Sequence, residues 1–104
     1  MKDEGYNIIT PDDYKLENNY PNPFNPSTSI SFKLPLQKKI SLKIYDMLGR
    51  EVATLINNEV YEPGNFKITW DGTNNYGSKV ASGNYIATLT YGNYSKSIKM
   101  TLLK

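Results

Sequence analysis

The sequence predicts an all-β protein, a seven-stranded antiparallel β-sandwich without a disulfide bond. Three observations lead to this fold class: segments in which apolar and polar residues alternate, turn residues between those segments, and the lack of a convincing amphipathic helix. The 104 residues correspond to one domain, which at this size buries roughly two thirds of its unfolded surface. Such a chain needs neither metal nor disulfide to form a core.

The predicted strands follow one another at the spacing of a β-sandwich. They lie near Leu16 and over residues 28–34, 40–45, 51–56, 66–70, 85–91 and 94–104. Turns between them are predicted at Asp46–Gly49, Pro63–Gly64, Asp71–Gly72 and Gly92–Asn93. The alternation predicts a core that contains Ile30, Phe32, Leu42, Ile44, Phe66, Ile68, Trp70, Leu89 and Met100.

One tyrosine favours an immunoglobulin-like topology. Tyr85 begins the sixth predicted strand, where such sandwiches place a tyrosine whose hydroxyl binds an upstream loop. Ala87 stands where antibody domains carry a cysteine, and Trp70 lies on the fifth strand rather than the third. We therefore expect a relative of the immunoglobulin sandwich that lacks the antibody hallmarks.

Composition argues against most enzyme classes. The chain has no cysteine and no histidine, which removes thiol catalysis, zinc-thiolate sites and the usual general base. We expect no enzymatic activity, no cofactor and no metal. The net charge is +2, and the basic residues are spread without a nucleic-acid motif, so no nucleic-acid partner is predicted. No apolar stretch reaches the ~20 residues of a membrane span.

The N-terminal residues differ in character from the rest. Residues 1–13 are polar and acidic, and we expect a linker or cloning remnant, followed by a domain over residues 14–104. Met1 is not followed by a signal peptide. We therefore expect either a cytoplasmic protein or the terminal domain of a longer exported protein whose signal peptide lies upstream.

The segment Tyr20–Pro26 is the most tightly specified loop, and we call it the proline motif. Its prolines fix φ, remove backbone donors and push the preceding residues toward extended geometry. Phe24 is its one large apolar residue. The motif is either a rigid loop that pins Phe24 onto the end of the domain, which local physics favours, or a recognition surface.

Two further sites are considered. The loop Asp71–Gly77 offers oxygen ligands for an ion, but it lacks a second carboxylate, and its residues are also those that tight turns favour. A sugar-binding platform is conceivable from four tyrosines, which are Tyr61, Tyr76, Tyr91 and Tyr94. Tyrosines are ordinary strand residues, so this signal is weak.

From Tyr14 to Lys104 the chain resembles the C-terminal sorting domains of the bacterial type IX secretion system, in their immunoglobulin-like form (type A). Residues 19–28 are similar throughout to a motif of that family, Asn-Tyr-Pro-Asn-Pro-Phe-Asn-Pro-Ser-Thr. The hairpin over 42–52 and the end over 99–104 are similar as well. The half from Trp70-Asp71-Gly72 to Tyr85 is shared with the immunoglobulin-like domain of the flagellar hook-capping protein.

The resemblance implies a domain that is recognised rather than one that catalyses. It would direct an upstream cargo through the outer-membrane translocon, from the periplasm to the cell surface or the medium, with a sortase-like peptidase as a second partner. The implied recognition residues are those of the proline motif (Tyr20, Pro21, Asn22, Pro23, Phe24, Asn25 and Pro26) and of the last strand (Lys99, Met100, Leu102, Leu103 and Lys104). We further expect the last strand to end free, with an edge open to strand addition.

Two other functions remain open. A carbohydrate-binding or adhesive module would carry an exposed aromatic patch, and a domain like that of the hook cap would assemble through its sheet edges.

Overall fold

The computed structural model describes residues 8–104, and it confirms the all-β prediction. A short 3-10 helix, η1 (Pro11–Asp13), precedes the strands. The seven strands are β1 (Lys15–Leu16), β2 (Thr28–Leu34), β3 (Lys38–Asp46), β4 (Glu51–Tyr61), β5 (Gly64–Trp70), β6 (Gly83–Tyr91) and β7 (Tyr94–Leu102). Every predicted strand is present. No helix within residues 8–104 is long and apolar enough to cross a membrane.

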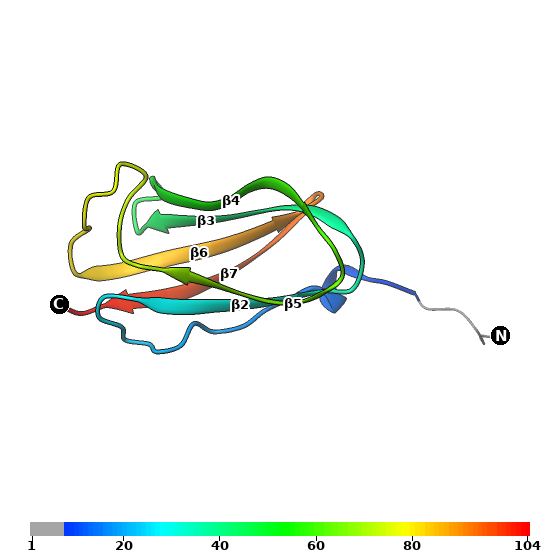
Figure 1. The fold of residues 1–104 in the computed structure, drawn as a ribbon, viewed down its shortest axis with the longest axis horizontal. Coiled ribbons are helices and arrows are strands. Elements are labelled where there is room, and N and C mark those ends of the chain that lie inside the picture. Colours follow the sequence, from blue (N-terminus) through cyan, green and yellow to red (C-terminus); the bar gives the residue numbers. More distant parts are fainter. Residues whose placement is uncertain (1–7) are drawn as a thin grey trace.

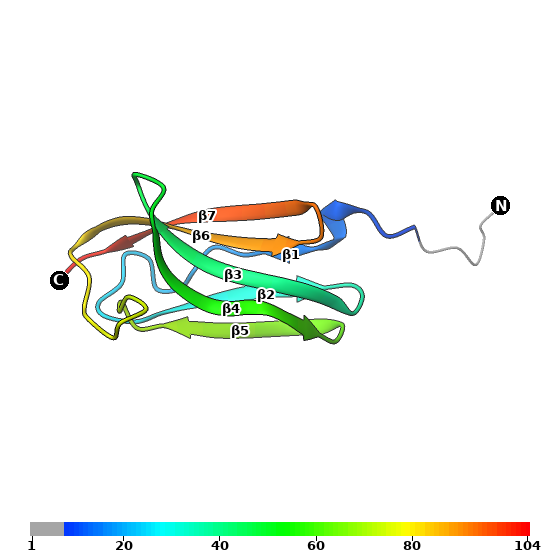
Figure 2. The same cartoon turned by 90° about the horizontal axis from the view of Figure 1, so that it is seen from above.

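The strands form two antiparallel sheets that face each other, as Figures 1 and 2 show. One sheet has the order β1-β2-β5, and the other has the order β4-β3-β6-β7. The turn between β6 and β7 lies at one end of the sandwich. The loop after β5, the turn between β3 and β4 and the last residues lie at the opposite end (Figure 1).

The core lies between the two sheets, where the alternation placed it. Of the nine residues that the alternation predicted to be buried, seven are, which are Ile30, Phe32, Leu42, Ile44, Trp70, Leu89 and Met100. Phe66 and Ile68 are only half-buried, so this part of the prediction is wrong. Their strand, β5, is an edge strand of the smaller sheet, so their side chains lie at the margin of the core.

Strand β4 is longer than predicted, because polar residues in its second half interrupt the alternation of apolar and polar side chains. The strand continues past Ile56 to Tyr61, with a shift of its register against β3 between the pairs Ile40–Glu59 and Leu42–Ile56. Asn58 takes φ of +51° there, a left-handed conformation that asparagine tolerates better than most residues. Its backbone N–H donates to Ser41 Oγ over 2.9 Å. The alternation that identifies a strand is lost at such a bulge.

Tyr85 confirms the immunoglobulin-like signature. Its hydroxyl donates to the carbonyl oxygen of Ala81 over 2.6 Å, and its ring meets that of Trp70 edge-on, with centroids 5.4 Å apart. Burial, and secondly the charge of Asp46, raise the pKa of Tyr85 above its ordinary value. Ala87 is fully buried, so packing alone joins the sheets at the position of the antibody disulfide.

The N-terminal residues of the described range pack on the sandwich. Thr10 caps η1 through its contacts with Asp13, and Tyr14 stacks on Tyr91 with ring centroids 4.4 Å apart. The Tyr91 hydroxyl donates to the Pro11 carbonyl oxygen over 3.1 Å. Thus the last residues of the predicted linker form a turn docked on β6, while residues 1–7 of that prediction lie outside the described range. The domain boundary at residue 14 stays a prediction.

Candidate functional site: the junction of the proline motif and the last strand

The proline motif follows β1 and leads into β2. Its first residue, Tyr20, forms a two-way backbone bridge with Ser29, with N–H to O distances of 3.0 and 2.9 Å. The side chain of Tyr20 is 82% exposed. The motif is therefore tied to the smaller sheet while its aromatic ring stays in solvent.

Phe24 pins the motif to the core, as the structural interpretation of this loop predicted. Its side chain is buried, and its ring centroid lies 5.6 Å from that of Trp70. A direct contact of a partner with the Phe24 ring is excluded while this packing holds. Whether the motif also acts in recognition stays a prediction.

The proline motif and the last strand lie side by side. The Phe24 N–H donates to the Thr101 carbonyl oxygen over 2.9 Å, and the Leu103 N–H donates to the Phe24 carbonyl oxygen over 3.0 Å. Phe24 thus forms a parallel bridge with Leu102. Asn22 adds a third bond, since its Oδ1 accepts the Thr101 N–H over 3.0 Å. The two sets of predicted recognition residues form one junction.

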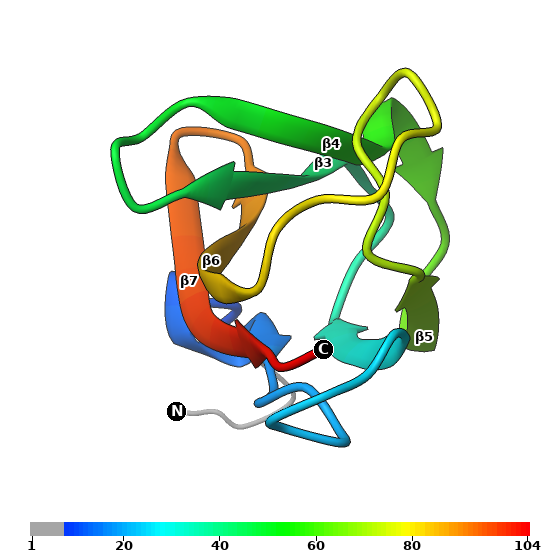
Figure 3. The same ribbon diagram turned by 90° about the vertical axis from the view of Figure 1, so that its left-hand side faces the viewer.

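This junction corrects the expectation that the last strand ends free. Backbone groups of Thr101 and Leu103 point away from β6 and form hydrogen bonds with the proline motif. In Figure 3 the last residues lie between the proline motif and the loop that follows β5. The Lys104 N–H donates to Ser82 Oγ over 3.1 Å, so the segment is held on both sides.

Only some of the predicted terminal residues are accessible. Met100 and Leu102 are fully buried and belong to the core. Lys99 and Lys104 are exposed, and Leu103 is 54% exposed. The side chains that a partner can touch are therefore two cations and one aliphatic group.

Asn19 and Thr28 organise the interior of the motif, and the sequence reasoning did not single them out as site residues. Asn19 is 4% exposed, and its Nδ2 donates to Thr28 Oγ1 over 2.9 Å and to the Pro21 carbonyl oxygen over 3.2 Å. Thr28 Oγ1 donates to that carbonyl oxygen over 2.8 Å. The signal was the family motif itself, which spans both residues.

Gly72 allows the loop after β5 to approach the motif. It takes φ of +78°, and a Cβ at this position would lie 3.0 Å from the carbonyl oxygen of Pro26. The neighbouring Trp70 donates its indole N–H to Thr73 O over 2.9 Å. The Trp-Asp-Gly sequence therefore serves the packing of this end.

In the candidate ion loop, side-chain oxygens accept hydrogen bonds from nearby residues and so stabilise tight turns. Asp71 Oδ1 accepts from the Thr73 N–H over 3.1 Å and from its hydroxyl over 2.6 Å. Asn74 Oδ1 accepts the N–H groups of Tyr76 and Ser78. Within residues 8–104 no three acidic, histidine or cysteine side chains gather as a metal site. The contacts favour the turn interpretation of Asp71–Gly77.

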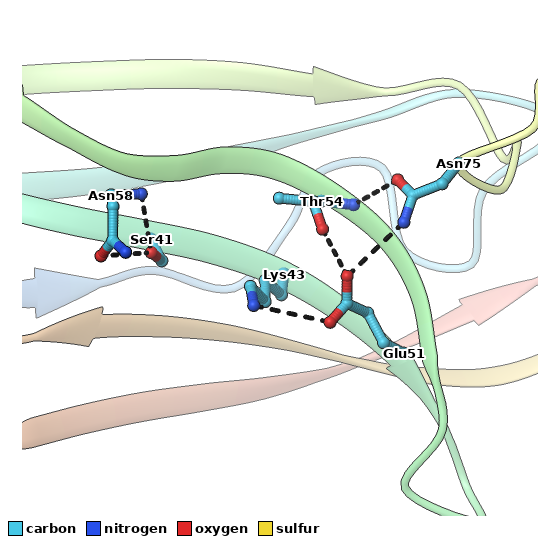
Figure 4. A network of polar contacts seen from close by, with 6 residues as sticks. All are labelled: Ser41, Lys43, Glu51, Thr54, Asn58 and Asn75. Atoms are coloured by element: carbon cyan, nitrogen blue, oxygen red, sulfur yellow. Dashed lines mark hydrogen bonds and ion pairs between the residues drawn. The ribbon is translucent and has the colours of Figure 1, made fainter.

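The same loop also caps β4, on the other edge of the larger sheet (Figure 4). Asn75 Oδ1 accepts the Thr54 N–H over 2.8 Å, and the Asn75 N–H donates to Val52 O over 3.0 Å. Glu51 accepts hydrogen bonds from Thr54 Oγ1 and Asn75, and it pairs with Lys43 at 3.5 Å. The Thr54 bond, followed by the Lys43 charge, lowers the pKa of Glu51.

The four tyrosines of the conceivable sugar platform do not come together. Tyr91 is buried between Tyr14 and Tyr94, and Tyr61 packs against Phe32. Tyr76 is exposed, but it lies in the loop after β5, at the opposite end from the β6–β7 turn, after which Tyr94 begins β7 (Figure 1). A shared platform of these residues is therefore wrong.

Comparison with known proteins agrees with this fold. The sequence profile of the FlgD Ig-like domain matches residues 18–95. Among curated proteins, none matches this chain.

Two solved structures from Porphyromonas gingivalis are similar to it. One is PorZ, an essential bacterial surface component of the type-IX secretion system, with 25% identity and a TM-score of 0.58. The other is dimeric latent PorU, with 22% identity and a TM-score of 0.67, a likeness that shows the fold alone. Each alignment covers 86% of this chain, but only 11% of PorZ and 9% of PorU.

The matched profile spans more than half of the chain, from before the proline motif into β7. The immunoglobulin-like sandwich and the Tyr85 contact agree with it. This chain therefore belongs to the FlgD Ig-like domain family.

Proposed function

We propose that this chain is a non-catalytic C-terminal sorting domain of type A, which directs an upstream cargo through the outer membrane by the type IX secretion system. The observation that carries the proposal is the junction of Phe24 with Thr101 and Leu103. It joins two of the segments through which the chain resembles sorting domains, the proline motif and the end of the last strand. The likeness to PorZ, a component of that system, supports the same assignment.

The arrangement suits a domain that is read by another protein. Lys99, Leu103 and Lys104 are exposed. The Leu103 N–H is held by Phe24 O and the Lys104 N–H by Ser82 Oγ. A surface that is rigid before binding loses less conformational entropy on binding. The proposed partners are the translocon and a sortase-like peptidase.

Cargo and recognition surface would lie at opposite ends of the domain. The turn η1 packs beside the start of β7, whereas the junction lies at the end of β7 (Figure 1). A cargo attached before η1 therefore leaves the junction accessible. The proposed route leads through the periplasm to the cell surface or the medium.

The test is export of a passenger. A passenger protein with a signal peptide is fused before the 104-residue chain and produced in a bacterium that has a type IX system. We expect the passenger at the cell surface, and we expect it to stay in the periplasm of the same strain without the translocon. Retention in both strains, or equal delivery by both, would contradict the proposal.

The family match favours one second candidate, an assembly domain like that of the flagellar hook-capping protein. Such a domain would self-associate through its sheet edges. Sedimentation of the isolated chain distinguishes the two functions, because a sorting domain needs no self-association. Oligomers at micromolar concentration, together with failure of export, would favour the assembly function.

A further inference from the structure

The outer edge of β7 determines how a partner can read the last strand. In the antiparallel register with β6, Thr101 lies opposite Asn84, and its backbone N–H and C=O point away from β6. By alternation the same holds for Ser95, Ser97 and Lys99. Strand addition would require these groups to be open.

The end of this edge is already occupied. Both backbone groups of Thr101 are bonded, the N–H to Asn22 Oδ1 and the C=O to the Phe24 N–H. The Asn22 side chain here replaces the carbonyl group of a neighbouring strand. Displacing the pair would expose the buried Phe24 ring and open the core beside Trp70.

The rest of the edge runs beside the N-terminal segment. Strand β1 lies alongside β7, on the side where the two sheets approach each other (Figure 3). At the start of β7, Lys96 pairs with Asp12 at 3.7 Å. The chain from η1 to Phe24 thus runs beside β7, but among the outward backbone groups of β7 it forms hydrogen bonds, within residues 8–104, with those of Thr101 alone.

We propose that Asn22 and Phe24 lock the end of the β7 edge at Thr101, and that the partner reads this locked end through its side chains and not by strand addition. This inference rests on the proposed sorting function. The exposed side chains that a partner can contact are Lys99, Leu103 and Lys104. Neither lysine forms an ion pair within residues 8–104. These three side chains fit a protein surface with an apolar site flanked by carboxylates. Asn22 and Phe24 are positioning residues.

A reversible crosslink tests the locked state during export. The chain has no cysteine, so the pair Asn22→Cys/Thr101→Cys introduces one defined disulfide across the lock. The pair Thr88→Cys/Ser97→Cys is the matched control, because these side chains touch across β6 and β7 at 2.8 Å, away from the lock. Both variants are fused to the passenger and oxidised in the periplasm. We measure surface delivery and, in the same cells, the fraction of the fusion that carries the disulfide.

Side-chain reading predicts that oxidation does not change delivery, so that each variant is delivered equally well with its disulfide formed and after reduction. Delivery of the control together with a tenfold loss for the crosslinked lock, restored by reduction, would overturn the inference and show that the strand must open. Failure of the unmodified fusion would instead refute the sorting function. Replacing Lys99 and Lys104 by Glu should reduce delivery at least tenfold, whereas Lys67→Glu on β5 should not. Equal delivery by both charge variants would overturn the inference as well.

Hydrogen exchange on the 104-residue chain tests the lock without export. It therefore applies even if neither crosslinked variant reaches the cell surface. We expect Asn22→Ala to accelerate exchange of the Thr101 amide at least tenfold. Asn25→Ala should leave it unchanged, because Asn25 has no side-chain hydrogen bond within residues 8–104. An equal Thr101 rate in all three chains would overturn the lock.

Discussion

Phe24 and Thr101 share a backbone hydrogen bond of 2.9 Å that joins the loop before β2 to the end of the last strand. The Phe24 side chain is buried against Trp70, and the Thr101 N–H is held by Asn22. Disturbing the loop therefore also disturbs the last strand. The predictions below separate the packing role of this end from its proposed role in sorting.

Trp70→Ala should lower the free energy of unfolding by about 3–5 kcal/mol, the usual cost of removing a large buried aromatic side chain. Trp70 is buried, and its ring meets those of Phe24 and Tyr85. Urea unfolding at pH 7 measures the change. Tyr76→Ala, at a position 92% exposed, is the control and should change little. Equal stability of both variants would refute the core assignment.

Stability should fall in acid, in part through Asp46. The backbone N–H of Arg50, together with its guanidinium and the Leu48 N–H, lowers the pKa of Asp46. A carboxyl group with a lowered pKa stabilises the fold above its unfolded pKa of about 4, and the contribution is lost as pH falls through the folded pKa. Unfolding measured between pH 7 and pH 2 should therefore show a shallower decline for Asp46→Asn.

Glu59→Gln serves as the control for this series. Glu59 is exposed and has no side-chain hydrogen bond or ion pair within residues 8–104. If Asp46→Asn and the parent lose stability equally over this range, the assignment of the acid effect to Asp46 is wrong.

Tyr85→Phe should cost about 1 kcal/mol, because it removes the hydroxyl bond to Ala81. The raised pKa of Tyr85 adds a signature in alkali. Its contribution is complete below the unfolded pKa of about 10 and is lost as pH rises through the folded pKa. The parent should therefore lose more stability than Tyr85→Phe above pH 10. Parallel curves would contradict a buried, bonded hydroxyl.

Removal of Leu102, Leu103 and Lys104 should stop export while the domain still folds. The deletion takes away one fully buried residue, Leu102, at a cost of about 2–5 kcal/mol, and also the hydrogen bonds of the Leu103 and Lys104 N–H groups. Leu102→Ala in the full chain has a similar packing loss but keeps the exposed residues, and it should still be exported. Surface delivery and thermal unfolding are measured for both. Delivery of the truncated chain at the parent level would refute the role of this segment.

Most of the fold follows from local physics, because an alternating strand with one buried face leaves a clear pattern. The second half of β4 shows where this signal ends, since the bulge at Asn58 breaks the alternation. The half-buried Phe66 shows a second limit. Alternation indicates which face a residue lies on, but not whether its strand is at the edge of a sheet.

The candidate site was less predictable. The proline content indicated a stiff loop, and Phe24 was expected to pack on the end of the domain. The bonds of Asn22 and Phe24 with Thr101 depend on a loop and a strand from opposite ends of the chain, and no local pattern records such a contact. The free end of β7 was wrongly expected for the same reason.

Export of two matched variants tests the central claim most directly, namely that the junction carries the sorting information. Phe24→Ala breaks the packing at the junction. Phe66→Ala removes a half-buried ring on β5 that, within residues 8–104, packs against the rings of Phe32 and Tyr61 and forms no aromatic contact with the last strand. Surface delivery of the passenger is measured at a temperature where melting curves show both domains folded. We predict a loss of at least tenfold for Phe24→Ala and delivery within about twofold of the parent for Phe66→Ala. Equal delivery of the two variants would contradict the account.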